Sequence, residues 1–234
     1  MRMSTKGVAM LIASEGIVPA PYKDSKGVWT YGIGHTAAAG APNPNEMPRG
    51  MPDDLDAELR NVFTLFRNDL TRYEYDVSSA IDVPLKQHQF DALVHFHYNT
   101  GGIDAARLTQ QINAGDMAGA GESFMRWTKP AEIIPRRKAE QALFVHGTYS
   151  NAAATVWNAD NRGKVIWKPV RTLSPAEVQG LMRGPVNPTT ISTAATGAIL
   201  GGISDYSGLP PAATVAIAVA GAVALFLILR KVKR

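Results

Sequence analysis

The stretch ASEGIVPAPYKDSKGVWTYGIGHT, residues 13–36, predicts that a helix ends and a small β-hairpin begins within a few residues of each other. Gly16 is a natural helix terminator, and the two prolines that follow prevent the chain from continuing as a helix. DSKG, which begins at Asp24, has the composition of a tight turn, and the Val, Trp, Thr and Tyr after it favour a strand. We therefore expect a hairpin that brings Asp24 and Thr30 together.

The helix before this hairpin should place Glu15 at the border of the core. Ser4 has the chemistry of an N-cap, and Val8 and Leu11 share one apolar face. Glu15 follows Val8 by seven residues and therefore lies on that same face. Burial at such a position disfavours the charged carboxylate and should raise the pKa of Glu15, whereas the polar turn should keep Asp24 ionised.

Two carboxylates in contrasting surroundings are the groups that hydrolysis of a glycosidic bond requires. One protonates the leaving oxygen, and the other handles water or the sugar cation. The spacing alone is weak evidence, because a Glu, Asp and Thr at these intervals occur by chance in about a few per cent of chains of this length. The alternative is a solvated glutamate at a helix end, an ordinary turn aspartate and a strand threonine.

Composition excludes several other classes of function. The 234 residues are 45% hydrophobic and contain no cysteine, so a packed globular domain is expected without disulfides or thiolate metal sites. The formal charge of +4 is confined to the end of the chain, where RKVKR holds four of the 24 basic residues. The remaining 20 basic side chains balance the 20 acidic ones, so we expect no nucleic-acid partner.

The C-terminal part of the sequence predicts a membrane anchor. Residues 211–229 contain no charge and, as a helix, would span about 28 Å, close to the thickness of a bilayer core. A basic tail, residues 230–234, follows, as is typical after a membrane segment; a buried core helix is the alternative. Small residues at intervals of four could pack such helices together: Ala212, Ala216, Ala220 and Ala224. The first 16 residues favour a short amphipathic helix over an export signal.

Between these ends the sequence divides into recognisable parts. Residues 37–53 are too rich in Pro, Gly and Asn for regular structure, whereas residues 55–148 repeat apolar side chains at helical intervals. Residues 151–186 predict an extension made of a hairpin and a short helix capped by SPAE. We expect a first domain at residues 1–150, then this extension, and then a flexible linker at 187–210 before the membrane segment.

The opening stretch closely resembles the start of the phage-type lysozymes, the endolysins that cut peptidoglycan. Their signature is Glu, Asp and Thr at these spacings followed by G-x-G-H, here residues 32–35. Later segments are similar in the same order: LFRNDL at 65–70, LKQHQFDALVHFHYNTGG at 85–102 and IIPRRKAEQALF at 133–144. The resemblance covers about residues 5–150 and departs from the family at the insertion 37–52, at Pro130 and Pro135, and after Tyr149.

The resemblance implies an α+β fold with a small hairpin lobe and a larger helical lobe, joined by a long helix, and no cofactor. It implies that Glu15 protonates the glycosidic oxygen and that Asp24 and Thr30 hold the attacking water, with inversion at the anomeric carbon. It also implies a structural ion pair between His35 and Asp69.

Other side chains are weaker candidates. Tyr22 and Asn99 are candidates for substrate binding, although Asn99 before two glycines also suits a helix C-terminus. Arg136 and Arg137 either meet anionic groups of the wall or form a solvated turn. His88, His95 and His97 lack the spacing of a zinc site, so we expect no metal.

Two hypotheses about function follow. The first is a membrane-tethered muramidase that cleaves the β-1,4 bond between N-acetylmuramic acid and N-acetylglucosamine of peptidoglycan, and the intact Glu, Asp and Thr favour it. The second is a catalytically silent protein that binds the wall or builds a virion. The anchor predicts either the host inner membrane, with the enzyme facing the periplasm, or a virion membrane or particle.

Overall fold

The computed structural model describes residues 1–184, so the predicted linker, membrane segment and basic tail lie outside the described residues. In the described part, none of the helices combines the length and the apolar composition that crossing a bilayer requires. The elements follow in the order α1 (Thr5–Glu15), β1 (Val18–Lys23), β2 (Trp29–Gly32), β3 (His35–Thr36), α2 (Leu55–Ala80), α3 (Gln87–Thr100), α4 (Arg107–Asn113), α5 (Met117–Ser123), α6 (Ile134–His146), β4 (Ala154–Ala159), β5 (Val165–Leu173) and α7 (Pro175–Arg183). One-turn 3₁₀ helices occupy Ala37–Ala39, Phe124–Arg126 and Ala131–Ile133.

The predicted hairpin is confirmed and forms part of a three-stranded antiparallel sheet. β2 is its central strand, with β1 on one side and β3 on the other. Thr30 of β2 lies opposite Tyr22 of β1 and Thr36 of β3. The sheet therefore fixes Tyr22 and Thr30 as cross-strand neighbours.

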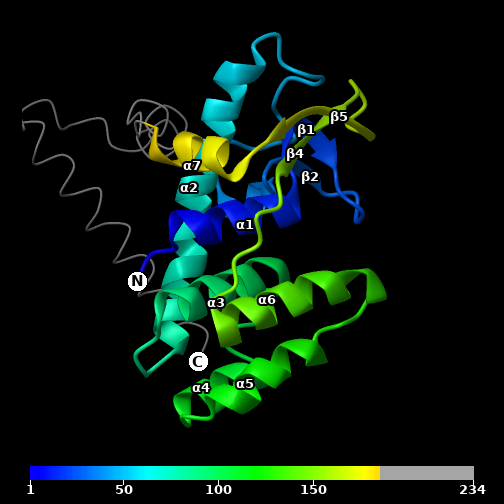
Figure 1. The fold of residues 1–234 in the computed structure, drawn as a ribbon. Coiled ribbons are helices and arrows are strands. Elements are labelled where there is room, and N and C mark those ends of the chain that lie inside the picture. Colours follow the sequence, from blue (N-terminus) through cyan, green and yellow to red (C-terminus); the bar gives the residue numbers. More distant parts are fainter. Residues whose placement is uncertain (185–234) are drawn as a thin grey trace, which may run out of the picture. The chain divides into compact units, whose positions relative to one another are not determined.

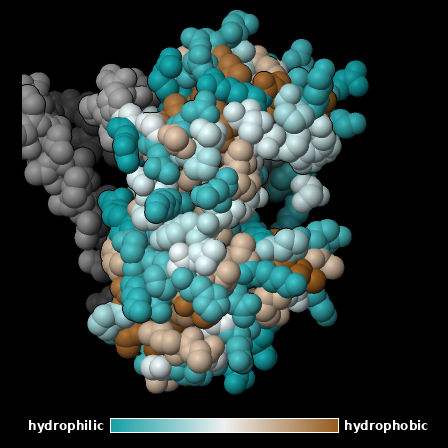
Figure 2. Space-filling model, viewed as in Figure 1, coloured by the Kyte–Doolittle hydropathy of each residue, from teal (hydrophilic) through white to brown (hydrophobic). Residues whose placement is uncertain are grey.

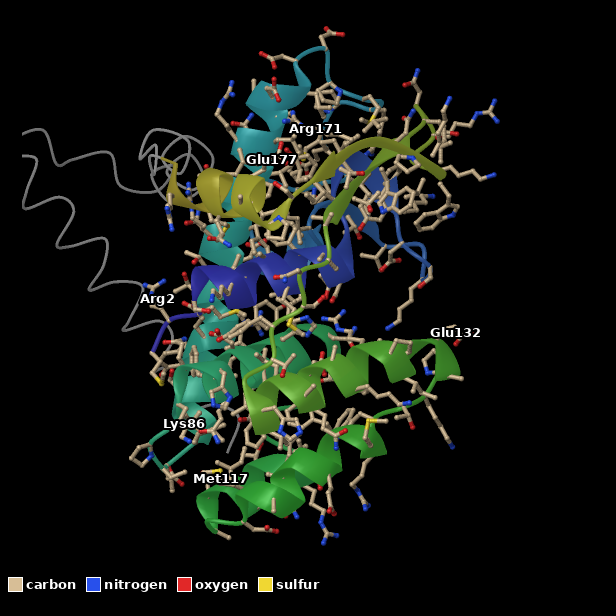
Figure 3. All side chains as sticks on the ribbon, viewed as in Figure 1. Arg2, Lys86, Met117, Glu132, Arg171 and Glu177 are labelled. Carbon is tan, nitrogen blue, oxygen red and sulfur yellow. The ribbon has the colours of Figure 1, made fainter. Side chains whose placement is uncertain are left out.

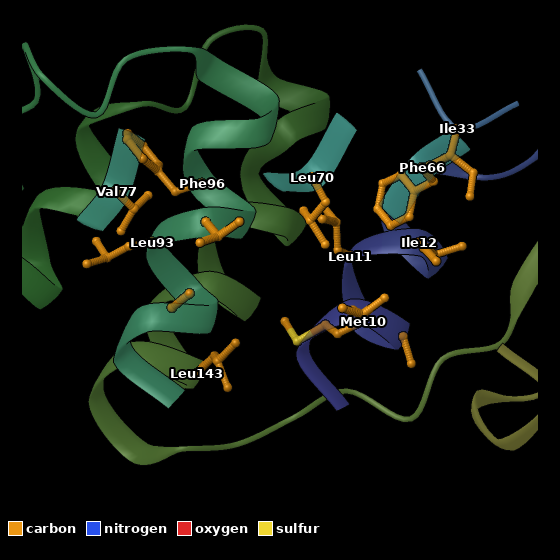
Figure 4. Close-up of a cluster of buried hydrophobic side chains, with 14 of the residues drawn as sticks. Met10, Leu11, Ile12, Ile33, Phe66, Leu70, Val77, Leu93, Phe96 and Leu143 are labelled. Atoms are coloured by element: carbon orange, nitrogen blue, oxygen red, sulfur yellow. The ribbon is translucent and has the colours of Figure 1, made fainter. Parts of the chain in front are cut away.

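Helix α1 begins and ends as the sequence predicts. The Ser4 hydroxyl accepts a hydrogen bond from the Gly7 amide at 3.0 Å, which satisfies a donor that the first turn leaves free. Gly16 ends the helix with a φ of 74°, a conformation that glycine adopts without steric cost. Buried side chains of α1 and α2 belong to one apolar cluster, in which Leu11 lies beside Leu70 and Ile12 beside Phe66 (Figure 4).

The long helix α2 connects the sheet with the helices that follow. Asp54 is its N-cap, with a carboxylate that accepts a hydrogen bond from the Ala57 amide, and the 26 residues of the helix extend toward α3 (Figure 1). Most of the apolar stripe read from the sequence is buried, which confirms the predicted core face: Leu59, Val62, Phe63, Phe66 and Leu70. The prediction that residues 37–53 lack regular structure is wrong at Ala37–Ala39, which form a one-turn 3₁₀ helix, and is confirmed for residues 40–53, which contain no helix or strand.

The extension after residue 150 folds back onto the beginning of the chain. β4 and β5 form the predicted antiparallel hairpin, and Ser174 and Glu177 form the predicted capping box of α7. Arg171 of β5 binds Asp56 at 2.5 Å and lies 3.5 Å from Glu177 of α7 (Figure 3). Because α7 also packs on α1 and α2, residues 151–184 are part of the same folded unit as the helices and sheet before them. The described fold is α+β.

Candidate active site

Strand β1 links the two carboxylates that the sequence singles out. Glu15 is the last residue of α1, and Asp24 lies in the turn directly after β1. The Glu15 side chain is 20% exposed, so it borders the core without being sealed in it. Figure 2 shows the surface hollowed between the end of the molecule that holds the sheets and the end that holds α3 and α6.

The turn after β1 fixes the carboxylate of Asp24. Its Oδ1 accepts hydrogen bonds from the backbone amides of Lys26 and Val28, each at 2.8 Å. The backbone closes the same turn, because the Asp24 amide donates to the Val28 carbonyl. The second oxygen, Oδ2, has no hydrogen bond with any residue in the described part. Asp24 therefore keeps one oriented acceptor free for water or substrate.

Thr30 and Tyr22 lie side by side next to this turn. Thr30 is buried, and its hydroxyl donates to the Val28 carbonyl at 3.1 Å. Burial, followed by the charges of Glu15 and Asp24, raises the pKa of Tyr22 to about 12. Tyr22 consequently remains a neutral phenol at physiological pH, within electrostatic reach of both carboxylates.

Arg136 of α6 forms an ion pair with Glu15. Arg136 Nη2 lies 2.6 Å from Glu15 Oε1. That oxygen is buried and has no donor in hydrogen-bonding geometry among residues 1–184, so we treat the contact as an ion pair and not as a directed hydrogen bond. The pair joins the end of α1 to the start of α6.

A buried network holds Arg136 in place. Glu140, one turn further along α6, accepts from Arg136 Nε at 3.1 Å. The same Glu140 oxygen lies 2.6 Å from His95 Nδ1 of α3, and both side chains are completely buried. Glu140 and His95 were not among the residues predicted for the site, although the i, i+4 spacing of Arg136 and Glu140 on a helix is a detectable signal.

The sequence profile described as phage lysozyme matches residues 12–140, a range that contains Glu15, Asp24 and Thr30 and ends at Glu140. The chain belongs to the phage lysozyme family. This lysozyme is 34% identical over 151 residues to the endolysin of Salmonella phage P22, an alignment that covers 62% of this chain and 99% of that endolysin. It is 32% identical over 146 residues to the SAR-endolysin of Escherichia phage Mu, covering 57% of this chain and 75% of that protein.

Solved structures agree with this membership. A crystal structure of a P22 lysozyme mutant superposes with a TM-score of 0.52 at 29% identity, covering 62% of this lysozyme and 99% of that chain. The muramidase domain of SpmX from Asticaccaulis excentricus gives a TM-score of 0.52 at 26% identity, covering 62% of this chain and 97% of that one. The family profile ends before β4, so the β4–β5 hairpin and α7 lie outside the matched range.

For Arg137 both predicted alternatives are wrong: it neither faces anionic groups of the wall nor lies in a solvated turn. Its side chain is fully buried, and it donates to Glu140 and to the Asn99 amide oxygen. Desolvation lowers the pKa of Arg137, although the charge of Glu140 opposes that shift. Asn99 is exposed at the end of α3, so it remains a candidate for substrate contact while it also accepts from Arg137.

Arg137→Met should therefore lower stability, because it removes a cation from a buried ion pair. Breaking such a pair costs about 3–5 kcal/mol of unfolding free energy. Urea unfolding followed by circular dichroism measures the change. Arg162→Met, at an exposed position of the β4–β5 turn, is the control and should stay within about 0.5 kcal/mol of the parent. A similar small effect for Arg137→Met would show that the buried pair does not form.

The structure brings His35 and Asp69 together. His35 Nδ1 lies 2.8 Å from Asp69 Oδ2, and Nε2 lies 2.8 Å from the Pro42 carbonyl oxygen. A carboxylate and a carbonyl only accept, so both contacts are hydrogen bonds only when both ring nitrogens donate, which is the charged imidazolium form. Burial lowers the pKa of His35, but the hydrogen bond and charge of Asp69 together with backbone acceptors outweigh it, and the net shift is upward.

Asp69→Asn should destabilise the lysozyme more at pH 5 than at pH 9. A folded-state pKa raised above the unfolded value adds stability below the unfolded pKa, about 6.5, and that stability is lost as pH rises through the folded pKa. Thermal unfolding of parent and variant at the two pH values tests this. Asp104→Asn, at an exposed position, is the control. Equal destabilisation at both pH values would contradict the charged pair.

His88 and His97, the other two members of the set His88, His95 and His97, have separate contacts. His88 Nδ1 lies 2.9 Å from the Leu143 carbonyl oxygen, and His97 Nε2 lies 3.1 Å from Asp76. Within residues 1–184, no group of three side chains is arranged to hold a metal ion.

Proposed function

We infer that this chain is a peptidoglycan hydrolase of the phage lysozyme family, and we propose that it cleaves the β-1,4 bond between N-acetylmuramic acid and N-acetylglucosamine. The observation that carries the proposal is the pair of acidic side chains at the two ends of β1, one on a core border and one in a hydrogen-bonded turn. Two carboxyl groups in such contrasting surroundings can divide the roles of acid and base.

Glu15 is the proposed proton donor. Its side chain lies at the end of α1, and Arg136 holds the Oε1 side of the carboxyl group by an ion pair. The other oxygen has no ion pair within the described part, so when the carboxyl group is protonated this oxygen can present the proton to the glycosidic oxygen while Oε1 stays against Arg136. Arg136 is a positioning residue in this proposal, because it orients Glu15 and is itself held by Glu140.

Asp24 and Thr30 are proposed to hold the attacking water. Asp24 Oδ1 is committed to two backbone amides, which leaves Oδ2 as an acceptor for a proton of that water. The Thr30 hydroxyl lies next to the same turn through its bond to Val28. Attack by a water held on the face opposite the donor would invert the anomeric carbon, as the family resemblance implies. Tyr22, whose pKa responds to the charges of both carboxylates, remains a proposed substrate contact.

Clearing of a suspension of purified peptidoglycan tests the function. The full chain, kept in mild detergent, should lower the turbidity of the suspension and release soluble sugar fragments. A silent wall-binding protein would sediment with the peptidoglycan and leave its turbidity unchanged. That outcome would favour the second hypothesis over the hydrolase.

We also propose that residues 211–229 tether the enzyme to a membrane through the linker at 187–210. Support comes from the uncharged run of 19 residues and the basic residues that follow it. The tether would place the catalyst at the host inner membrane, facing the periplasm, or in a virion membrane or particle. Full-length protein expressed in bacteria should stay in the membrane pellet after a carbonate wash and enter solution with detergent. Recovery in the aqueous fraction without detergent would contradict the tether.

A further inference from the structure

An exposed tryptophan lies on the extension that the family profile does not cover. Trp167 of β5 is 76% exposed, and the apolar side chains of Ile166 and Val170 on the same strand are also exposed, at 41% and 42%. Large apolar side chains grouped on a surface commonly mark a binding site. Trp167 lies in an irregular part of the hairpin, because Asn158 pairs with Ile166 whereas the preceding residue of β4 pairs with Pro169.

The bulge in β5 and the ring of Trp157 together fix the position of Trp167. The two residues between those pairs, 167 and 168, are extra residues of β5, and such bulges re-aim side chains. The Trp167 ring meets the ring of Trp157 on β4 edge to face, with centroids 5.4 Å apart and planes at 77°. Trp167 is therefore exposed to solvent while its ring rests edge to face against Trp157, and this contact defines its position.

Trp157 in turn lies against the catalytic segment. A Cβ at Gly16, the residue after Glu15, would come within 3.0 Å of Trp157 Nε1, so the indole packs closely on this glycine. Trp157 also joins the small apolar cluster to which Val18 and Tyr22 of β1 belong. The exposed Trp167 is thus one aromatic ring away from the residues that carry the proposed chemistry.

Backbone hydrogen bonds fix the hairpin at both ends of β1. The Trp157 amide donates to the Ile17 carbonyl at 2.8 Å, two residues after Glu15. The Lys23 amide donates to the Gly163 carbonyl at 2.8 Å, one residue before Asp24. Figure 1 shows β4 and β5 beside β1 and β2. Since the hairpin is attached next to each carboxylate, its exposed face has a set position relative to the bond that is cut.

The charge of the hairpin suits a polymer with carboxylates. The segment 154–173 contains one acidic side chain, Asp160, and four basic ones: Arg162, Lys164, Lys168 and Arg171, the last of which is paired with Asp56 and Glu177. Lys168 is the neighbour of Trp167 in the bulge and is exposed. Peptidoglycan presents pyranose faces, which stack on aromatic rings, together with the carboxylates of its stem peptides, which attract lysine and arginine.

We propose that Trp167, supported by Trp157 and flanked by Lys168, binds the peptidoglycan strand outside the cleavage site. The ring stacks on an N-acetylhexosamine, and the lysine pairs with a stem-peptide carboxylate. This inference rests on the proposed function, since it extends the same substrate beyond the catalytic residues. The hairpin then acts as a second contact that raises affinity for long strands without taking part in bond cleavage.

Two measurements on the full chain test this site. The first is sedimentation with purified peptidoglycan in a Glu15→Gln background, so that the wall is not consumed during binding. Adding Trp167→Ala should weaken binding by about tenfold, the loss typical of an aromatic anchor, and Trp167→Phe should restore part of it. Tyr75→Ala is the matched control, because Tyr75 is 71% exposed on α2, and it should bind like the parent.

The second measurement uses the active chain and two substrates. Trp167→Ala should require more peptidoglycan for half-maximal rate with little change in kcat, and should cut a tetrasaccharide muropeptide at the parent rate. Unaltered wall binding of Trp167→Ala, with the parent still active, would overturn the site and leave the hydrolase intact. If Trp167→Ala leaves wall binding unchanged but alters the oligomer size, another copy of the chain covers the ring. If it lowers the unfolding temperature, another part of the same chain covers the ring. Either result overturns the proposal. Equal loss on both substrates would show that Trp167 acts on catalysis through Gly16, which also overturns the proposal.

Discussion

Glu15→Gln should lower the rate of wall hydrolysis by about 10² to 10⁴-fold or more, because glutamine keeps the shape of the side chain but has no acidic proton to transfer to the glycosidic oxygen. Stability should change little. Arg136 loses one partner but retains its contact with Glu140, and the position is partly exposed. The initial rate of turbidity loss measures the effect on hydrolysis, and urea unfolding measures the effect on stability.

Glu122→Gln is the control for this variant. Glu122 is an exposed residue of α5, and its replacement should leave the rate unchanged. A Glu15→Gln protein that retains more than about a tenth of the parent rate would exclude Glu15 as the general acid.

Asp24→Asn should produce a loss of similar size by removing only a charge. The asparagine Oδ1 can still accept from the Lys26 and Val28 amides, so the turn should survive. The free oxygen that we propose as the acceptor for water becomes an amide nitrogen, which cannot accept a proton. We expect a rate lower by about 10² to 10⁴-fold with the thermal unfolding temperature nearly unchanged.

Asp160 offers a matched control for that turn. Its Oδ1 accepts from the amides of Arg162 and Lys164, each at 2.9 Å, and the backbone closes the turn in the same way. Asp160→Asn therefore makes the same chemical change in the same local geometry, but in the β4–β5 turn. If both variants lose activity equally, the effect belongs to such turns in general and not to a catalytic role of Asp24.

Much of this architecture is predictable because local chemistry determines it. Ser4, Gly16 and the Ser174 capping box set helix ends through contacts within a few residues, and the apolar stripe of α2 follows from helical periodicity alone. The resemblance to phage-type lysozymes supplied the roles of Glu15, Asp24 and Thr30, which spacing by itself supports weakly.

The contacts that complete the site depend on distant parts of the chain. Arg136 meets Glu15 across 121 positions of sequence, and no local pattern distinguishes it from the neighbouring Arg137, which is buried. Trp157 reaches Gly16 because β4 bonds to Ile17, and such long-range pairing is not encoded in the hairpin's own alternation. Local patterns therefore predicted the elements but not the long-range partners of Glu15 and Gly16, whereas the pair of His35 and Asp69 came from the family resemblance.

The bond that the enzyme cuts is identified by the new sugar ends that cleavage exposes. Purified peptidoglycan digested by the full chain is treated with borohydride, which converts each new reducing sugar to its alcohol, and the products are separated and identified by mass spectrometry. We expect muramitol at the new ends made by the parent enzyme, and none above background with the Glu15→Gln protein. Glucosaminitol at those ends, or no new reducing ends from the parent, would contradict this expectation.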